Sequence, residues 1–284
     1  MRVKSTAVLA LCAVSFGLAA CNAPKTPAGP TITPTAPTIT PTAPAFSPTA
    51  PATTTTTAAA TPVTAGSTVL TTPYPPNPGF VAITQEELKG TRGTLTYDLP
   101  VPGLGVASKA VNYEAARGFN DCMAMVADKY LTTYKDAQWV RDEGKNSRVE
   151  RIGQHVLSGL LSVQIYSGGA HPFDKEATCV INADTSSLLT LKDVFADETK
   201  GLQLLSEQSA KLLPDTRAGA AFIKAGITPT PENFQAWTAI PEGMHVYFPQ
   251  GQVAAQAAGS VDIVIPWTVL QAQLKPGMLA VLSS

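Results

Sequence analysis

The sequence lacks charge over a long N-terminal stretch, because no Asp, Glu, Lys or Arg lies between Lys25 and Glu86. Thr, Pro and Ala dominate this stretch, and the heptapeptide at 31–37 is repeated at 38–44. Large apolar side chains are too scarce there to offset the entropy of ordering the chain. Regular prolines favour extended polyproline II, so we expect residues 21–78 to form a disordered stalk, either unmodified or O-glycosylated.

The sequence also lacks an excess of basic residues. Charged residues make up 14% of the chain, and the formal net charge is −1 at pH 7. A protein that binds the phosphate backbone of DNA or RNA normally presents a basic surface. We therefore expect no nucleic-acid partner and no polybasic membrane patch.

Motifs of well-known catalytic and metal sites are absent from the sequence. There is no GxSxG, HExxH or CxxC motif, and the three histidines show no ligand spacing with cysteines or carboxylates. We therefore expect no metal and no cofactor. An enzymatic activity is not excluded, but the sequence favours a protein that is not an enzyme.

The N-terminus has the pattern of a bacterial lipoprotein signal. Arg2 and Lys4 precede an uncharged apolar run over 7–20, which is too short to span a bilayer comfortably. The run ends in Leu-Ala-Ala directly before Cys21, which resembles a lipobox. We expect a signal peptide over 1–20 and acyl chains, such as palmitate, on Cys21 that hold the protein on a membrane of the bacterial cell envelope, on its extracytoplasmic side. The alternative is an ordinary signal peptide with a chance cysteine.

Two cysteines remain after Cys12 is removed with the signal peptide and Cys21 is acylated. Cys122 and Cys179 would lie outside the cytoplasm, where disulfides persist. A disulfide between them would close a long loop and stabilise the fold. The alternatives are two buried free thiols, or a redox or metal site.

Residues 79–284 have the composition of a single globular domain. Apolar residues at helical spacing predict a long helix over 108–134, with Cys122 on its buried face. Period-two patterns predict strands, and leucine spacing predicts shorter helices. The expected strands are 94–99, 139–141, 148–155, 161–166, 176–183, 234–240, 244–248 and 261–265. The expected further helices are 201–213, 217–225 and 267–274, and 189–195 is expected to pass from a strand end into a short helix. The fold class is α+β, a mostly antiparallel sheet with a long helix packed on one face.

Several segments together resemble one known family. They are Tyr97-Asp98-Leu99-Pro100, Phe119-Asn120, the turn from Tyr166 to Pro172, Val180-Ile181-Asn182, Leu189 to Phe195, Gly243 to Phe248 and Val264 to Trp267. This is the family of the extracytoplasmic domain of the lysozyme-sensing anti-sigma factor RsiV. It is also found with peptidoglycan deacetylases and in mycobacterial secreted immunogenic proteins. The resemblance implies an α+β module that often works by binding, although some mycobacterial relatives have been described as esterases.

The turn that carries Gly168, Gly169 and His171 is the candidate functional site, because glycines permit positive φ and loops often carry function. A triad of Ser167, His171 and Asp174 is conceivable.

The other two histidines, His155 and His245, lie in strand patterns and are interpreted as structural. The carboxylates of Asp174, Glu176, Asp184 and Asp262 are scattered and read as solvated. Four aromatic residues could form a binding face or belong to the core: Tyr166, Trp237, Tyr247 and Trp267, for the last of which we favour the core.

Two functions of different class follow. The first is a lipid-anchored module of the cell envelope that binds a protein, such as a lysozyme, or a wall polymer. The second is an envelope hydrolase, esterase-like, that acts on an ester or a cell-wall component. The stalk and the missing nucleophile motif favour the first.

Overall fold

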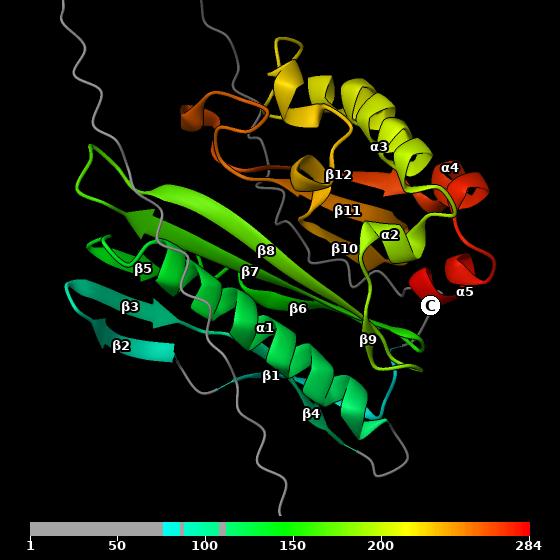
Figure 1. Cartoon of the computed structure of the whole chain (residues 1–284), viewed down its shortest axis with the longest axis horizontal. Coiled ribbons are helices and arrows are strands. Elements are labelled where there is room, and N and C mark those ends of the chain that lie inside the picture. Colours follow the sequence, from blue (N-terminus) through cyan, green and yellow to red (C-terminus); the bar gives the residue numbers. More distant parts are fainter. Residues whose placement is uncertain (1–75, 86–87, 108–111) are drawn as a thin grey trace, which may run out of the picture. The chain divides into compact units, whose positions relative to one another are not determined.

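The computed structural model describes residues 76–85, 88–107 and 112–284, which lie in one compact unit (Figure 1). The expected signal peptide, Cys21 and almost all of the expected stalk lie outside the described residues. Within the described ranges, no helix is long and apolar enough to cross a membrane.

A seven-stranded sheet forms the centre of the domain. Its strands run in the order β2-β3-β5-β7-β8-β9, with β6 paired to β7 beside β5. All neighbours are antiparallel except β3 and β5, so the predicted α+β class is confirmed. The strands are β2 (Leu88–Arg92), β3 (Leu95–Leu99), β5 (Trp139–Arg141), β6 (Arg148–Ile152), β7 (Val156–Tyr166), β8 (Phe173–Asn182) and β9 (Ser187–Leu188).

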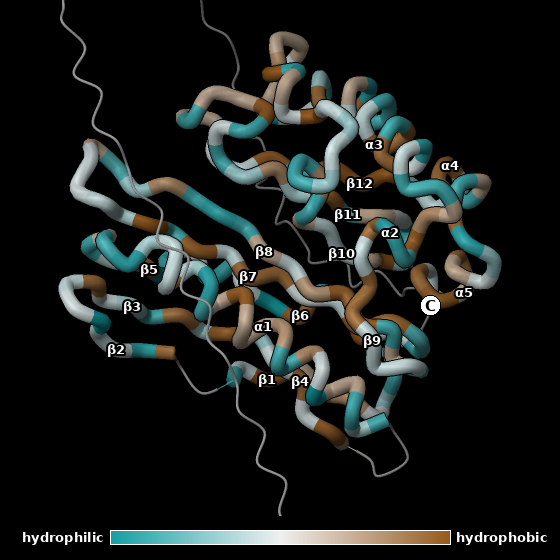
Figure 2. The backbone as a smooth tube through the Cα atoms, in the orientation of Figure 1, coloured by the Kyte–Doolittle hydropathy of each residue, from teal (hydrophilic) through white to brown (hydrophobic). Residues whose placement is uncertain are grey.

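Helix α1 (Tyr113–Thr133) covers one face of this sheet, as the sequence predicts. Its N-terminus is capped by the Asn112 side chain, which accepts a hydrogen bond from the Glu114 backbone N–H. Its buried stripe repeats at helical spacing and includes Phe119, Met123 and Leu131. Figure 2 shows the apolar residues of β7 in the middle of the sheet. Together they form the first of two large cores.

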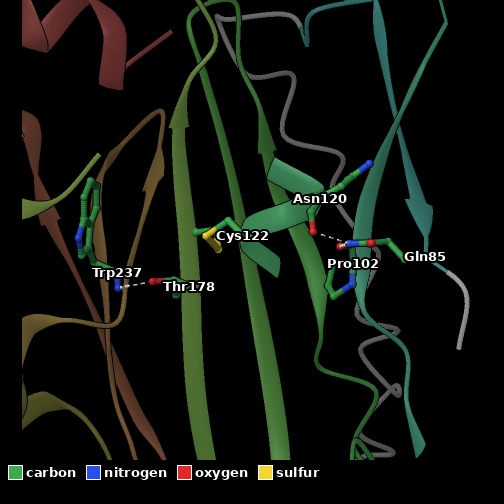
Figure 3. Close-up of a disulfide and its surroundings, with 7 residues drawn as sticks. Gln85, Pro102, Asn120, Cys122, Thr178 and Trp237 are labelled. Atoms are coloured by element: carbon green, nitrogen blue, oxygen red, sulfur yellow. Dashed lines mark hydrogen bonds between the residues drawn. A yellow bond between two sulfur atoms is a disulfide. The ribbon is translucent and has the colours of Figure 1, made fainter. Parts of the chain in front are cut away.

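Cys122 on α1 and Cys179 on β8 form a disulfide, with their Cα atoms 6.1 Å apart (Figure 3). The predicted pairing is therefore confirmed. It holds the helix to the middle of the sheet, where Cys179 lies opposite Gly159 of β7.

A two-stranded ribbon, β1 (Phe80–Thr84) with β4 (Pro102–Val106), was not predicted from the sequence. The sequence predicts a strand over 94–99 and no strand directly after it, where Pro100 and Pro102 follow. Pro102 instead begins β4, a position where a strand tolerates a missing N–H. The Asn120 side chain fixes the ribbon to α1, since its Oδ1 accepts from Leu104 N at 2.7 Å and its Nδ2 donates to Leu104 O at 3.0 Å.

The C-terminal part covers the other face of β7 and β8. A second sheet contains β10 (Trp237–Ile240), β11 (Gly243–Phe248) and β12 (Val261–Pro266), all antiparallel. Its helices are α2 (Leu191–Val194), α3 (Glu198–Leu212), α4 (Trp267–Leu270) and α5 (Met278–Leu282). Two hydrogen bonds join the sheets: Trp237 N to Thr178 Oγ1 at 3.0 Å, drawn in Figure 3, and Ser158 Oγ to Ala239 O at 2.9 Å.

Two boundary predictions in this part were wrong, while the short helix expected within 189–195 is present as α2. The helix expected over 217–225 is replaced by turns and one 3₁₀ turn, Lys224–Ile227, because Gly219 has φ +66° and breaks the helical path. The strand expected from Phe234 begins only at Trp237, since 231–234 forms a 3₁₀ turn. Strand β9 ends at Leu188, before the expected 189–195 segment, and a capping box formed by Thr190 and Asp193 then starts α2.

Candidate functional site

The turn predicted as the functional site is an exposed hairpin loop between β7 and β8. The Nδ1 atom of His171 donates to the Pro172 carbonyl oxygen at 2.9 Å, so the ring is engaged by the local backbone. Gly168 has φ +91°, as expected for a tight turn. Gly169 does not adopt positive φ, and a Cβ at this position would meet no atom within 4 Å. The expectation that Gly169 requires positive φ was therefore wrong.

The conceivable triad of Ser167, His171 and Asp174 is not assembled. Asp174 lies in β8, where its backbone N–H donates to Gln250 Oε1 at 2.8 Å. Across the described ranges, no serine hydroxyl is hydrogen-bonded to a histidine ring, and no three His, Cys, Asp or Glu side chains are grouped to hold a metal. Within these ranges, no serine is thus placed to be activated by a histidine.

His245 on β11 lies in an ionic cluster that the sequence did not reveal. Its Nε2 is 2.8 Å from Oδ2 of Asp262, and its Nδ1 is 3.4 Å from Oε1 of Glu150 and 2.9 Å from the Tyr247 hydroxyl. Glu150 is the extra residue of a β-bulge in β6, and a bulge redirects its side chain. Asp262 is 54% exposed, as expected for a solvated carboxylate, but its Oδ2 is bound to His245.

Burial opposes protonation of the His245 ring, but Asp262 and Glu150 outweigh it and raise its pKa to about 9. Its hydrogen bond and charge in turn hold the pKa of Asp262 below the usual range. At neutral pH His245 is therefore a cation that joins β6, β11 and β12, as the structural reading of this histidine predicts. It is not a free base.

The four aromatic residues separate clearly. Trp237, Tyr247 and Trp267 are buried, which confirms the expectation for Trp267. Tyr166 is half-buried at the end of β7, and its ring centroid lies 5.6 Å from that of Trp139 on β5. Trp139 was read only as a strand residue in the sequence. Trp139 and Tyr166 are neighbours because β5 pairs with β7 in this register, which cannot be predicted from the local sequence.

Trp139 lies on the face of the sheet opposite α1, at the β3 and β5 end, beyond the part of this face at β7 and β8 that the C-terminal part covers. Because side chains alternate along strands, Thr96 and Asp98 of β3 share this face with Trp139 and Arg141 of β5. A groove of about 870 Å³ lies over it. Its lining comes from β2, β3, β5 and the loop after β5, and includes Lys89, Thr91, Thr96, Asp98, Arg141 and Glu143.

The charges of this groove are paired but accessible. The Lys89 ammonium lies 2.7 Å from Asp98 Oδ2, and Arg141 lies 3.6 Å from Glu143 Oε1. The Arg141 guanidinium also stacks over the Trp139 ring, 5.1 Å from its centroid. Exposed pairs of this kind contribute little to stability, so these side chains can exchange partners with a ligand at small cost. A tyrosine, an arginine and several hydrogen-bonding groups line this groove, and Trp139 borders it through its contact with Arg141. Such a combination is typical of a binding site.

Part of the chain is similar to known proteins. A peptidoglycan-N-acetylmuramic acid deacetylase, PdaC, of Bacillus subtilis (strain 168) is 31% identical over 180 residues, which are 58% of this chain and 38% of that protein. Two crystal structures of members of the DUF3298 family are also similar. One from Bacteroides fragilis has TM-score 0.47 and 16% identity, and one from Pseudomonas aeruginosa PAO1 has 0.43 and 13%; each match covers 72% of this chain and 96% of the other. Residues 192–268 match the family model described as "Protein of unknown function (DUF3298)". The DUF3298 model thus matches part of the chain, in agreement with the family resemblance of its sequence.

Proposed function

We propose that this protein is a lipid-anchored module of the bacterial cell envelope that binds a wall polymer through the open face of its main sheet. The observation that carries the proposal is the groove lined by Tyr97 and Arg141, with the Trp139 ring stacked against Arg141 and packed beside Tyr166. Aromatic rings offer flat apolar surfaces for sugar rings, and an arginine fork matches the carboxylates of a peptidoglycan strand. The groove is also large enough to take several groups of a polymer.

The similar deacetylase supports this ligand class. Its name gives peptidoglycan as its substrate, and the chain aligns with only 38% of its length. A shared region that binds the wall would serve both proteins, whichever chemistry the remainder performs. The hydrolase alternative finds no serine hydroxyl in contact with a histidine among the described residues, so binding is the function we favour.

Replacing Trp139 by alanine is expected to weaken binding of the full chain to purified peptidoglycan sacculi by about tenfold or more. Its ring supports the Arg141 guanidinium that lines the groove, and truncation of an aromatic residue at a binding site commonly has such an effect. Co-sedimentation at several sacculus concentrations measures it. Tyr113→Ala is the matched control, because Tyr113 is an exposed aromatic residue on α1, which covers the other face of the sheet. Equal sedimentation of both variants would contradict the proposal, as would wild-type binding to lysozyme with none to sacculi.

Replacing Cys21 by serine is expected to move the protein from the membrane fraction to the soluble fraction, or to leave its signal peptide uncleaved. Acyl chains on this cysteine would provide the anchor, and serine cannot form the thioether that carries them. Fractionation followed by detergent phase partitioning measures the change. Detergent-dependent membrane retention equal to that of the wild type would refute a lipid anchor at Cys21.

A further inference from the structure

A second, smaller cavity lies next to the groove, between the main sheet and the C-terminal part. Its volume is about 180 Å³, too small for a polymer but sufficient for one chemical group. The loop after β5 connects the two sites, because Asp142 lines both. The other lining residues are Gly144, Asn146, Ser162, Gln164, Asp174, Glu176, Arg217, Gly259 and Ser260.

Glu176 is the most unusual residue of this cavity. It lies on β8 with 9% of its surface exposed, and its Oε2 atom is buried without a hydrogen-bond partner among the described residues. The hydroxyl of Ser260, which precedes β12, is likewise buried without one. Buried polar atoms normally have hydrogen-bond partners. Ser260 lies close enough to Glu176 for its hydroxyl to lower the pKa of this carboxyl group. No further donor reaches Glu176 Oε2 among the described residues, and a ligand with N–H donors would supply one.

The charged side chains around the cavity indicate whether such a ligand is a cation or an anion. Asp142 is already used, since it accepts from the backbone N–H groups of Asn146 at 3.0 Å and Ser147 at 2.8 Å. The exposed Arg217 guanidinium donates to the Ser260 carbonyl oxygen at 2.6 Å. The side chains of Asp174 and Glu176 point to the same face of β8, and Asp174 adds a second carboxylate. Three carboxyl groups thus face one solvated guanidinium, which favours a cation.

We propose that this cavity is a subsite for a primary ammonium group of the ligand that occupies the groove. An ammonium carries three N–H donors and no acceptor, which complements Glu176 Oε2, Ser260 Oγ and the Asp174 carboxylate. This inference rests on the proposed wall-binding function. It adds that the protein would select a polymer that carries a free amine. A wall can supply such a group from two sources, an amino sugar without its acetyl group or the side-chain amine of a stem peptide.

The protonation of Glu176 supports this assignment. Burial is the main cause that raises its pKa to about 7; the nearby Ser260 hydroxyl opposes the shift, and Asp174 adds to it. Lys175 opposes it weakly and Asp262 adds weakly. At pH 6 the empty site therefore holds a neutral carboxylic acid. An entering ammonium stabilises the carboxylate, so binding releases the Glu176 proton to the buffer.

The test is titration calorimetry of the full chain at pH 6 with a tetrasaccharide of glucosamine and with its N-acetylated counterpart. We expect the wild type to bind the amine form about tenfold or more tightly, and Glu176→Gln to lose this preference while keeping its affinity for the acetylated form. Repeating the titration in buffers of different ionisation enthalpy counts protons. We expect about one proton released per bound glucosamine tetrasaccharide in the wild type and none in Glu176→Gln.

Asp174→Asn is the second variant, on a half-buried residue, in case Glu176→Gln does not fold. It should reduce the preference in part and keep the proton release. Nα-acetyl-lysine amide separates the sources: if it binds with the same proton release and the glucosamine tetrasaccharide does not, the group belongs to a stem peptide. Equal affinity for both tetrasaccharides, without binding of the lysine probe or release of a proton, would overturn the inference. Sacculus binding that still depends on Trp139 would then leave the proposed function intact.

Discussion

Replacing Cys122 and Cys179 together by alanine is expected to lower the free energy of unfolding by about 4 kcal/mol, the loss of chain entropy calculated for a loop of this length. The two cysteines are 57 residues apart in sequence, so the bridge restricts a long segment of the unfolded chain. The disulfide also holds α1 against β8 at the centre of the first core. A loss of this size is a large fraction of the 5–15 kcal/mol that is typical for a folded protein.

Urea denaturation of the wild type and the double variant, followed by circular dichroism, measures this difference. The wild type with reductant is the matched control, since it should approach the stability of the double variant. Thiol labelling of the denatured, unreduced protein gives a second readout, in which Cys122 and Cys179 should be unreactive. An unchanged urea midpoint would contradict a stabilising bridge.

Replacing Gly159 by valine is expected to destabilise the fold by about 3 kcal/mol or more, the upper range for overpacking in a core. Gly159 lies in the middle of β7, directly below α1. A Cβ atom there would lie 2.5 Å from Phe119 Cζ and 3.0 Å from Cε2. These are ring atoms of a fully buried side chain, which has no open space to move into. The helix must therefore rise from the sheet, which strains the disulfide beside it.

Gly169→Val is the matched control for this variant. Gly169 has no atom within 4 Å of the position that a Cβ would take, and its φ is not positive. We expect a melting temperature close to that of the wild type for Gly169→Val and a large decrease for Gly159→Val. A destabilisation of similar size in both variants would show that close packing against Phe119 is not what requires glycine at position 159.

The elements that could be predicted from the sequence are those with a clear local period. The stripe of α1 repeats over many turns, and β7, β8, β11 and β12 alternate or carry continuous apolar runs. Strand β4 could not be found in this way, because its residues are Pro102, Gly103, Leu104, Gly105 and Val106. Its glycines are required by close approach: a Cβ on Gly103 would lie 2.5 Å from Gln85 Cγ. That contact depends on tertiary structure.

The candidate site was hidden for a related reason. The predicted turn with His171 is a local feature, and a sequence motif draws attention to it. The groove depends instead on three short strands that are distant in sequence, and on the parallel pairing of β3 with β5. Glu176 was read as one of several solvated carboxylates, since alternation places it on a face of β8 but does not tell that the C-terminal part closes over that face.

The sharing of β7 and β8 between two cores has a consequence for the boundaries of the family. The matched segment, 192–268, contains most of the second core, but that core also requires Val156 and Val180 from the main sheet. Cut out alone, the segment would expose the apolar side of β10 and β11 to water. The segment matched by sequence is therefore smaller than the second core, and a fragment cut at the matched limits would lack the side chains of β7 and β8 that complete this core.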